Sequence, residues 1–260
     1  MEPRNFVEFH CHLDDAVYGN DRAQVIEACF TAGLKRLVTV ADPYEEDSLQ
    51  VTRDLLDAGS DVFATVGAHP HRADDYSAEI EARILAFSEH PRVIAIGEAG
   101  LDFFHNLSQP DHQRRVFLRQ VALARETGHP LVVHSRSAEA EALALLTRER
   151  FPFPVAFHCY TGPAATARDI IAAGHFISFS GILTFKNSME LRAIAAETPL
   201  DRLFTETDSP YLSPEPFRGR PNHPSRVVLV ARALAGIRDI PVEELNRHID
   251  MNFRRFFSVT

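Results

Sequence analysis

Two histidines separated by one residue, His10 and His12, are the first candidates for chemistry in this sequence. In an extended segment, residues two apart point to the same side of the chain, so both imidazoles can face one ion. Neutral imidazoles and carboxylates are good ligands for borderline divalent ions. Further residues of these types follow short β-branched or aromatic runs: Glu98, His134, His158 and Asp208. The pattern predicts a metal centre built from all six.

The elements that must position these residues alternate between such runs and amphipathic stretches. The expected strands are Phe6–His12, Arg36–Ala41, Val62–Ala68, Val93–Glu98, Leu131–His134, Val155–His158, Phe176–Ser180 and Leu203–Thr207. The expected helices span 21–33, 44–58, 75–89, 109–127, 137–150, 163–173, 187–197, 224–236 and 242–257. This alternation predicts parallel strands with crossover helices.

An open doubly wound sheet and a closed barrel are both compatible with that alternation. The open sheet would usually carry a glycine-rich turn after the first strand, where this chain has His10–Asp14. We therefore predict an α/β fold, a (β/α)₈ TIM barrel that forms a single domain over residues 1–260. In such a barrel all strand C-termini meet on one face, where the active sites of the fold lie. The six candidate ligands are then expected around one cavity.

Several basic residues are candidates for substrate contacts. Arg136 lies two residues beyond His134 and would point into the same cavity, where a guanidinium suits phosphate or carboxylate; a salt bridge is the alternative. Lys186, Arg218 and Arg220 lie in loops after the seventh and eighth strands, where barrels often bind phosphate. Solvated surface charge is the alternative for each of them. Four other histidines are expected to be structural or surface residues: His105, His112, His129 and His175.

The overall charge limits the partners. The formal net charge of −9 argues against sequence-blind coating of nucleic acid, which needs a basic face. A nucleic-acid substrate remains open, because bound divalent cations can make one pocket positive. No leader and no run of about 18 apolar residues is visible, so we expect a cytoplasmic protein without a membrane segment. Three cysteines without metal-site spacing are expected to be reduced thiols.

The residues named so far belong to segments that, taken together, resemble one known family. These segments are His10–Asp14, Gly67–His71, Ile96–Asp102, His134–Arg136, His158–Gly162, Ser178–Gly181 and Glu206–Leu212. Their order and spacing are similar to those of the TatD-type metal-dependent deoxyribonucleases of the amidohydrolase-like superfamily. The resemblance implies a metal-dependent hydrolase that cleaves phosphodiester bonds of DNA by a metal-activated water.

The resemblance also implies roles for residues in a site with two divalent ions. His10, His12, Glu98 and Asp208 would bind the first ion, and Glu98, His134 and His158 the second. Glu98 and Asp208 would be the catalytic carboxylates, with Asp208 as proton acceptor. Apart from the resemblance, Glu206 lies two residues before Asp208 on the same face and is a candidate for orienting a ligand, and His69, after the third strand, is a candidate substrate contact. The family uses Mg²⁺ or Mn²⁺, whereas four imidazoles favour Mn²⁺, Fe²⁺ or Zn²⁺.

Two positions depart from the family pattern. Glu8 stands where an Asp is usual, and Asn222-His223-Pro224 replaces Asn-Glu-Pro in the loop after the eighth strand. The altered loop keeps a second function open, the hydrolysis of a small amide, lactone or phosphoester at the same metal centre. A non-catalytic scaffold is the third alternative. All six ligand positions hold residues that can bind metal, which argues against this alternative. No obligate protein partner is predicted.

Overall fold

The computed structural model describes residues 5–59 and 61–259, in which eight strands form one sheet. The sheet runs in the order β1 to β8, and each neighbouring pair is parallel. The strands are β1 (Phe6–Cys11), β2 (Leu34–Ala41), β3 (Val62–Val66), β4 (Val93–Asp102), β5 (Leu131–Arg136), β6 (Val155–Phe157), β7 (Phe176–Phe179) and β8 (Leu203–Thr205). The ends of the predicted domain, residues 1–4 and 260, and Ser60 lie outside the described ranges.

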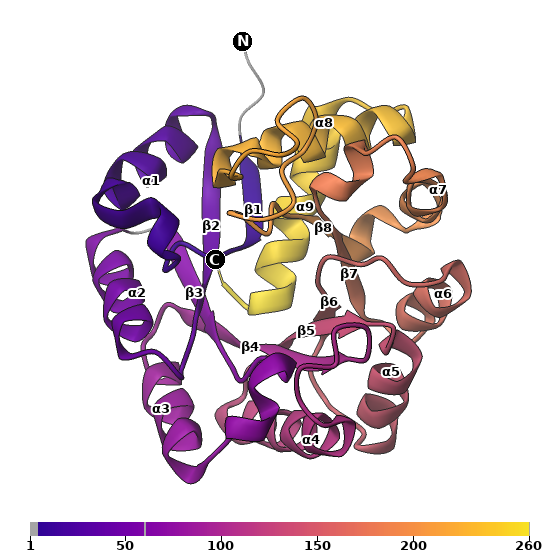
Figure 1. Cartoon of the computed structure of the whole chain (residues 1–260). Helices are drawn as coiled ribbons and strands as arrows, with labels where there is room; N and C mark the ends of the chain where they lie inside the picture. Colours follow the sequence, from indigo (N-terminus) through magenta and orange to yellow (C-terminus); the bar gives the residue numbers. More distant parts are fainter. Residues whose placement is uncertain (1–4, 60, 260) are drawn as a thin grey trace.

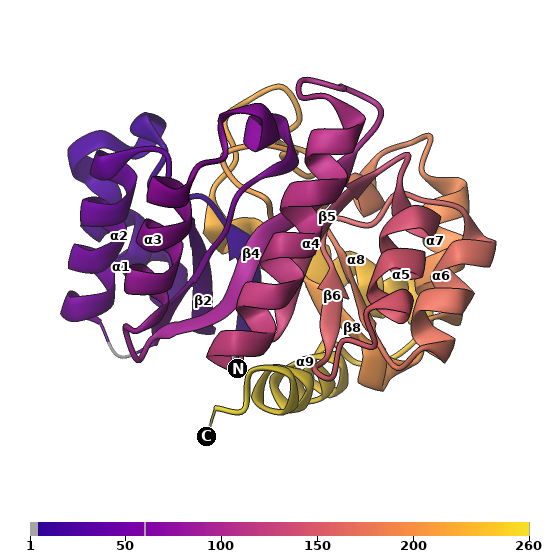
Figure 2. The ribbon, with the colours of Figure 1, turned by 90° about the horizontal axis from the view of Figure 1, so that it is seen from below.

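Helices surround this sheet on the outside, apart from the last one, which lies across one end of the barrel (Figure 1, Figure 2). They are α1 (Arg22–Thr31), α2 (Glu46–Ala58), α3 (Ala78–Ser88), α4 (Pro110–Thr127), α5 (Glu139–Arg148), α6 (Ala164–Ala172), α7 (Met189–Glu197), α8 (Val227–Arg238) and α9 (Val242–Phe257). Short 3₁₀ turns are η1 (Ala16–Asp21), η2 (Pro70–Asp75), η3 (Gly181–Thr184), η4 (Leu200–Arg202) and η5 (Pro224–Arg226). The predicted (β/α)₈ barrel is confirmed. None of the described helices is long and apolar enough to span a bilayer.

The seam between the first and last strands closes just beyond β8. The Asp208 amide donates to the His10 carbonyl at 3.0 Å, and the His12 amide donates to the Ser209 carbonyl at 2.8 Å. The buried Glu8 side chain adds to the seam, because its Oε1 accepts the Thr207 amide at 2.9 Å. The chain after β8 is therefore fixed against β1, and this contact sets the position of Asp208.

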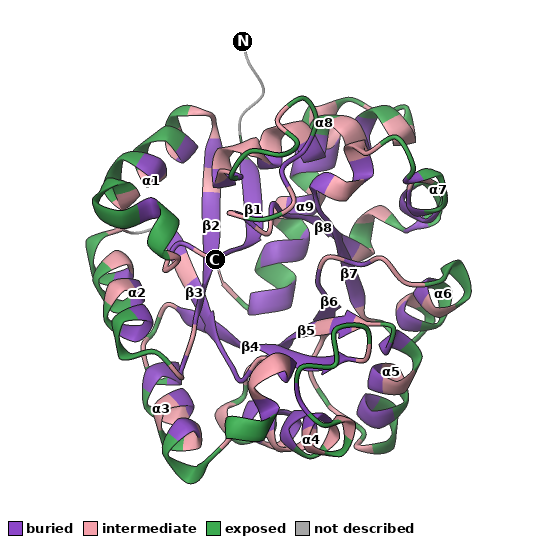
Figure 3. Cartoon of the chain, in the orientation of Figure 1, coloured by how far each residue is buried: buried purple, intermediate pink, exposed green. Residues whose placement is uncertain are grey.

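The core consists of the strands and the inward sides of the helices (Figure 3). Helix α9 lies across the end of the barrel opposite the long loops (Figure 2). Its aromatic residues join those of the strands, with the ring of Phe9 stacked on Phe204 at 4.2 Å and the rings of Phe176 and Phe256 at 5.3 Å. This packing closes one end of the barrel, so the opposite end is free for chemistry.

Strand β4 is longer than predicted and continues from Glu98 to Asp102. Its pairing with β5 shifts register between Ile96 and Ala99, and such irregularities re-aim side chains. Gly100 has a φ of 153°, and a Cβ there would lie 1.9 Å from the His134 carbonyl oxygen. Glycine is therefore required where β4 approaches β5 this closely.

The predicted helix over 75–89 is also divided. Ser77 is extended, and its side chain accepts the Ile80 amide as the N-cap of α3. The preceding residues form the separate turn η2, which begins with Pro70 directly after His69. His69 and His71 consequently lie on a fixed loop at the rim of the barrel.

Candidate metal centre

The six predicted ligands converge at the C-terminal end of the barrel in two overlapping clusters. The first cluster contains His10, His12, Asp208 and one oxygen of Glu98. His10 Nε2 lies 3.4 Å from Glu98 Oε2, and His12 Nε2 lies 3.3 Å from Asp208 Oδ1. The crossed pairs, His10 with Asp208 and His12 with Glu98, are each 3.8 Å apart.

The second cluster forms around the other oxygen of Glu98. Oε1 lies 2.8 Å from His134 Nδ1 and 2.6 Å from His158 Nε2. The two imidazole nitrogens are 3.4 Å apart. Glu98 thus stands between the clusters and presents one oxygen to each of them.

These donors fit divalent ions. Two ligand atoms that share one ion, each about 2.1 Å from it, are at most about 4.2 Å apart. The four separations in the first cluster lie within that limit. His10 is completely buried, and among the described residues neither of its ring nitrogens has a hydrogen-bond partner. A buried imidazole without such a partner costs free energy, and a cation would satisfy its lone pair.

The pKa values of these groups support the same conclusion. Burial would raise the pKa of Glu98, but the charge of His158 and the hydrogen bond from His134 outweigh burial and hold that pKa well below its ordinary value. Burial would lower the pKa of His12, yet the hydrogen bond and charge of Asp208 raise it to about 9. Without metal, the carboxylates are therefore ionised, and protons bound to imidazoles such as that of His12 supply the compensating positive charge. Divalent ions can replace those protons.

Two further carboxylates hold the ligands from behind. Glu206 is completely buried, and its Oε1 lies 3.4 Å from His158 Nδ1, the ring nitrogen that faces away from Glu98. Ser178 donates its hydroxyl to Glu206 Oε2. Glu8 Oε1 accepts the amide of His10 at 3.1 Å. Burial raises the pKa of Glu8 well above its ordinary value. Glu8, which stands where the family usually has Asp, thus contacts the backbone of the ligand residue His10.

His69 is brought into the centre, with Nε2 3.4 Å from Glu98 Oε1 and 3.3 Å from His134 Nδ1. Its Nδ1 accepts the backbone amide of His71 at 3.2 Å. Burial lowers the pKa of His69 to about 4, so the ring is neutral near pH 7. A neutral ring that accepts at Nδ1 carries its proton on Nε2. His69 therefore presents an N–H donor to the centre.

The predicted arginines occupy different surroundings. Arg136 ends β5 half-buried, with its guanidinium carbon 5.2 Å from the Phe104 ring centre, and among the described residues it forms no ion pair. Arg218 and Arg220 are exposed in the loop after β8. The Arg218 guanidinium lies over the Phe185 ring at 4.3 Å. The described contacts connect neither loop arginine with the six ligands, so their substrate roles stay predictions.

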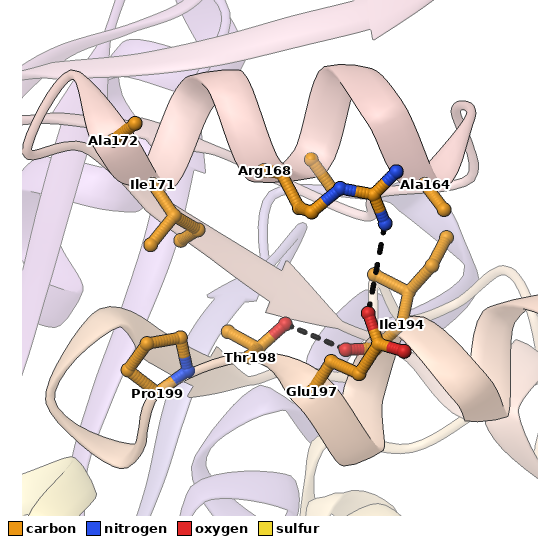
Figure 4. Close-up of a pocket in the computed structure, with 9 residues that line it drawn as sticks. Ala164, Arg168, Ile171, Ala172, Ile194, Glu197, Thr198 and Pro199 are labelled. Carbon is orange, nitrogen blue, oxygen red and sulfur yellow. Dashed lines mark hydrogen bonds and ion pairs between the residues drawn. The ribbon is translucent and has the colours of Figure 1, made fainter.

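A cavity of about 270 Å³ opens beside the centre and is lined by His12, His69 and Glu98. Its lining also includes three carboxylates, Asp14, Asp15 and Asp42, which we call the acidic wall. A separate cavity of about 280 Å³ lies between α6 and α7. Figure 4 shows that its lining is mostly aliphatic, with an Arg168–Glu197 ion pair of 3.6 Å as the charged feature. Chemistry of the kind predicted belongs to the first cavity.

Three residues near the centre were not assigned chemistry from the sequence. Asp102, at the end of β4, is completely buried and lies 3.2 Å from His134 Nε2. His71 and His105 also contact its Oδ2. Asp102 is four residues beyond Glu98, an interval that could have marked it as facing the same cavity. His105 was expected to be a surface or structural histidine, and its side chain is indeed 47% exposed.

Comparison with known proteins gives a consistent result. A family model described as TatD related DNase matches residues 7–258. The uncharacterized metal-dependent hydrolase YabD of Bacillus subtilis is 35% identical over 96% of this chain and 98% of its own length. The 3′-5′ ssDNA/RNA exonuclease TatD of Erwinia billingiae is 34% identical over 95% of this chain and 96% of its own. The crystal structure of YJJV, a TatD homolog from Escherichia coli, superposes with a TM-score of 0.91 at 25% identity, covering 98% of this chain and 99% of that one.

Proposed function

This chain belongs to the TatD-related DNase family of metal-dependent hydrolases, and we propose that it is a nuclease that cleaves phosphodiester bonds of DNA at a two-metal centre. The observation that carries the proposal is the position of Glu98. Its two oxygens face two separate sets of imidazoles, at 3.4 Å from His10 and at 2.6 Å from His158. A carboxylate between two donor sets is suited to hold two ions close together.

The proposed ligands follow from this arrangement. His10, His12, Asp208 and Glu98 Oε2 would bind one ion, and Glu98 Oε1, His134 and His158 the other. Bound divalent ions would acidify a water molecule and stabilise the negative charge that develops on phosphoryl oxygens. The mixed imidazole and carboxylate donors support Mn²⁺ or Zn²⁺ at least as well as Mg²⁺.

The chain's own groups would carry the remaining steps. Asp208, held in the left-handed region at a φ of 54°, has its Oδ1 3.3 Å from His12 Nε2 and would accept the proton of the attacking water. Glu206 would keep His158 oriented through Nδ1. The Nε2–H of His69 would donate to a phosphoryl oxygen. Arg136 would bind a substrate phosphate with its planar guanidinium.

A second candidate function is hydrolysis of a small amide, lactone or phosphoester. The acidic wall favours it, because three carboxylates beside the centre repel a polyanion. Burial raises the pKa of Asp42, which reduces that repulsion. The expected cytoplasmic location and the absence of an obligate protein partner stay predictions under either function.

The deciding experiment is hydrolysis of 3′-labelled single-stranded DNA with Mg²⁺, Mn²⁺ or Zn²⁺, beside a panel of small esters, amides and lactones. The Glu98→Gln variant, purified in parallel, controls for contaminating nucleases. Metal-dependent DNA cleavage that is absent in this variant supports the nuclease. Turnover of a small substrate without DNA cleavage supports the second candidate. If the fully metal-loaded protein hydrolyses neither DNA nor any of the small substrates, both proposed functions are contradicted.

A further inference from the structure

A group of donors at the end of β4, beside the proposed two-metal centre, has no role in the proposed function. Its central residue is Asp102, which is completely buried. Asp102 Oδ1 accepts two backbone amides, from Phe104 at 3.0 Å and from His105 at 2.8 Å. These two amides orient the carboxylate, so that Oδ2 faces other groups.

Three imidazole nitrogens lie around that one oxygen. His71 Nε2 is 2.7 Å from Asp102 Oδ2, His105 Nδ1 is 2.8 Å away and His134 Nε2 is 3.2 Å away. A carboxylate oxygen offers about two lone pairs, so three N–H donors are one more than Oδ2 accepts well. Hydrogen bonds between these rings and the carboxylate alone do not account for the whole group.

A cation resolves this mismatch. The proton of His134 belongs on Nε2 when its Nδ1 faces a metal, and Oδ2 then accepts that one N–H. The second lone pair of Oδ2 and the lone pairs of His71 Nε2 and His105 Nδ1 remain. These three donor atoms lie within 4.8 Å of one another. Two nitrogens and one carboxylate oxygen are a common ligand set for borderline divalent ions.

We propose that His71, Asp102 and His105 bind a third divalent ion at the edge of the main centre. The two imidazoles come from loops after β3 and β4, and Asp102 ends β4. The side chains of His71 and His105 are 27% and 47% exposed, so the ion is reachable from solvent and keeps positions open for another ligand. The site suits Zn²⁺ or Mn²⁺ better than Mg²⁺, because two of its three protein ligands are nitrogens.

The surroundings indicate what this ion would bind. Asp102 and Arg136 are partners in the register of β4 with β5. The third ion and the Arg136 guanidinium would thus form a positive edge beside the centre, on a protein of net charge −9. A phosphate next to the scissile bond is the ligand that this edge suits. That role rests on the proposed function, whereas the grouping of the three donor atoms does not.

The test is the metal content of the chain, together with the position of each ion. The probe is Zn²⁺ alone, added in excess to the full-length protein and then removed by dialysis. We expect His105→Ala to lose one equivalent of zinc relative to wild type. His112→Ala is the matched control, because His112 is 44% exposed and also contacts an aspartate, Asp74, at 2.8 Å. It should keep the wild-type content.

Anomalous diffraction at the zinc edge separates this site from the main centre. We expect a peak in contact with His71, Asp102 and His105 in wild type, its loss in His105→Ala and its persistence in Glu98→Gln. Equal zinc content in wild type and His105→Ala, or no peak at these residues, overturns the third site and leaves the two-metal centre untouched. A peak at the third site with none around Glu98 supports the third ion and overturns the proposed two-metal centre.

Discussion

Glu98→Gln removes one negative charge from between the two clusters while almost preserving the shape of the side chain. Glu98 is 5% exposed and has four imidazoles of the proposed ligands facing its oxygens, two at 2.6–2.8 Å and two at 3.4–3.8 Å. Removing one partner of a buried charged pair costs about 3–5 kcal/mol. At about 1.4 kcal/mol per tenfold, this is a loss of roughly two to three and a half orders of magnitude in metal affinity. Because the amide keeps a single oxygen, one cluster should lose its ion first.

The assay combines metal titration, turnover and thermal melting of the metal-free protein. Glu139→Gln is the matched control, since Glu139 is also 5% exposed but lies against Gly162 rather than in the centre. We expect the control to bind metal as wild type does and Glu98→Gln to melt at or above the wild-type temperature without metal. Unchanged metal affinity and turnover in Glu98→Gln would refute the bridging role of Glu98.

Four further outcomes are expected. Asp208→Asn should lower kcat by about 10²–10³-fold without lowering the melting temperature of the metal-free chain; wild-type kcat would contradict its role. Lowering the pH from 8 to 6 should weaken metal binding by about tenfold per pH unit for each displaced proton. The reason is that His12, with its pKa raised to about 9, is protonated throughout that range and must lose its proton to bind metal. Metal-binding curves measured at pH 8 and at pH 6 should therefore differ, and identical curves would contradict this linkage. Arg136→Lys should raise KM for DNA with kcat and metal content unchanged, whereas a lower melting temperature at constant KM would indicate a structural residue. Gly100→Ala should destabilise the fold by roughly 1–3 kcal/mol in chemical denaturation, since the added Cβ would meet the His134 carbonyl oxygen at 1.9 Å.

The fold could be predicted from the sequence because each strand carries a short apolar run and each helix an amphipathic pattern of its own. The end of β4 could not, since its extension to Asp102 depends on pairing with β5 across a register shift. Local patterns contain no information on such pairing. The 3₁₀ turns η1 and η3 were missed for a related reason, as short turns have no apolar period of their own.

The convergence of the six candidate ligands followed from the geometry of parallel barrels, because strand ends meet wherever the sequence places them. The surroundings of Asp102 followed from no such rule. His71 reaches it from the loop after β3, and His105 turns back onto it through an amide that Oδ1 accepts. Loop conformations of this kind depend on tertiary contacts. From the sequence alone, a histidine in such a loop is therefore predicted to be a surface residue.

The distribution of charge around the cavity constrains how a nucleic-acid strand would enter the proposed nuclease. Two divalent ions would bring four positive charges against the carboxylates of Glu98 and Asp208, which makes the reacting position positive on a protein of net charge −9. The acidic wall lies on one side of that position, lined by residues that follow β1 and β2. Arg136 and the proposed third ion lie on the side of β4 and β5. Since phosphates avoid the first side and favour the second, the backbone should extend over β4 and β5, and the cavity beside the acidic wall should take a part of the substrate that carries no phosphate.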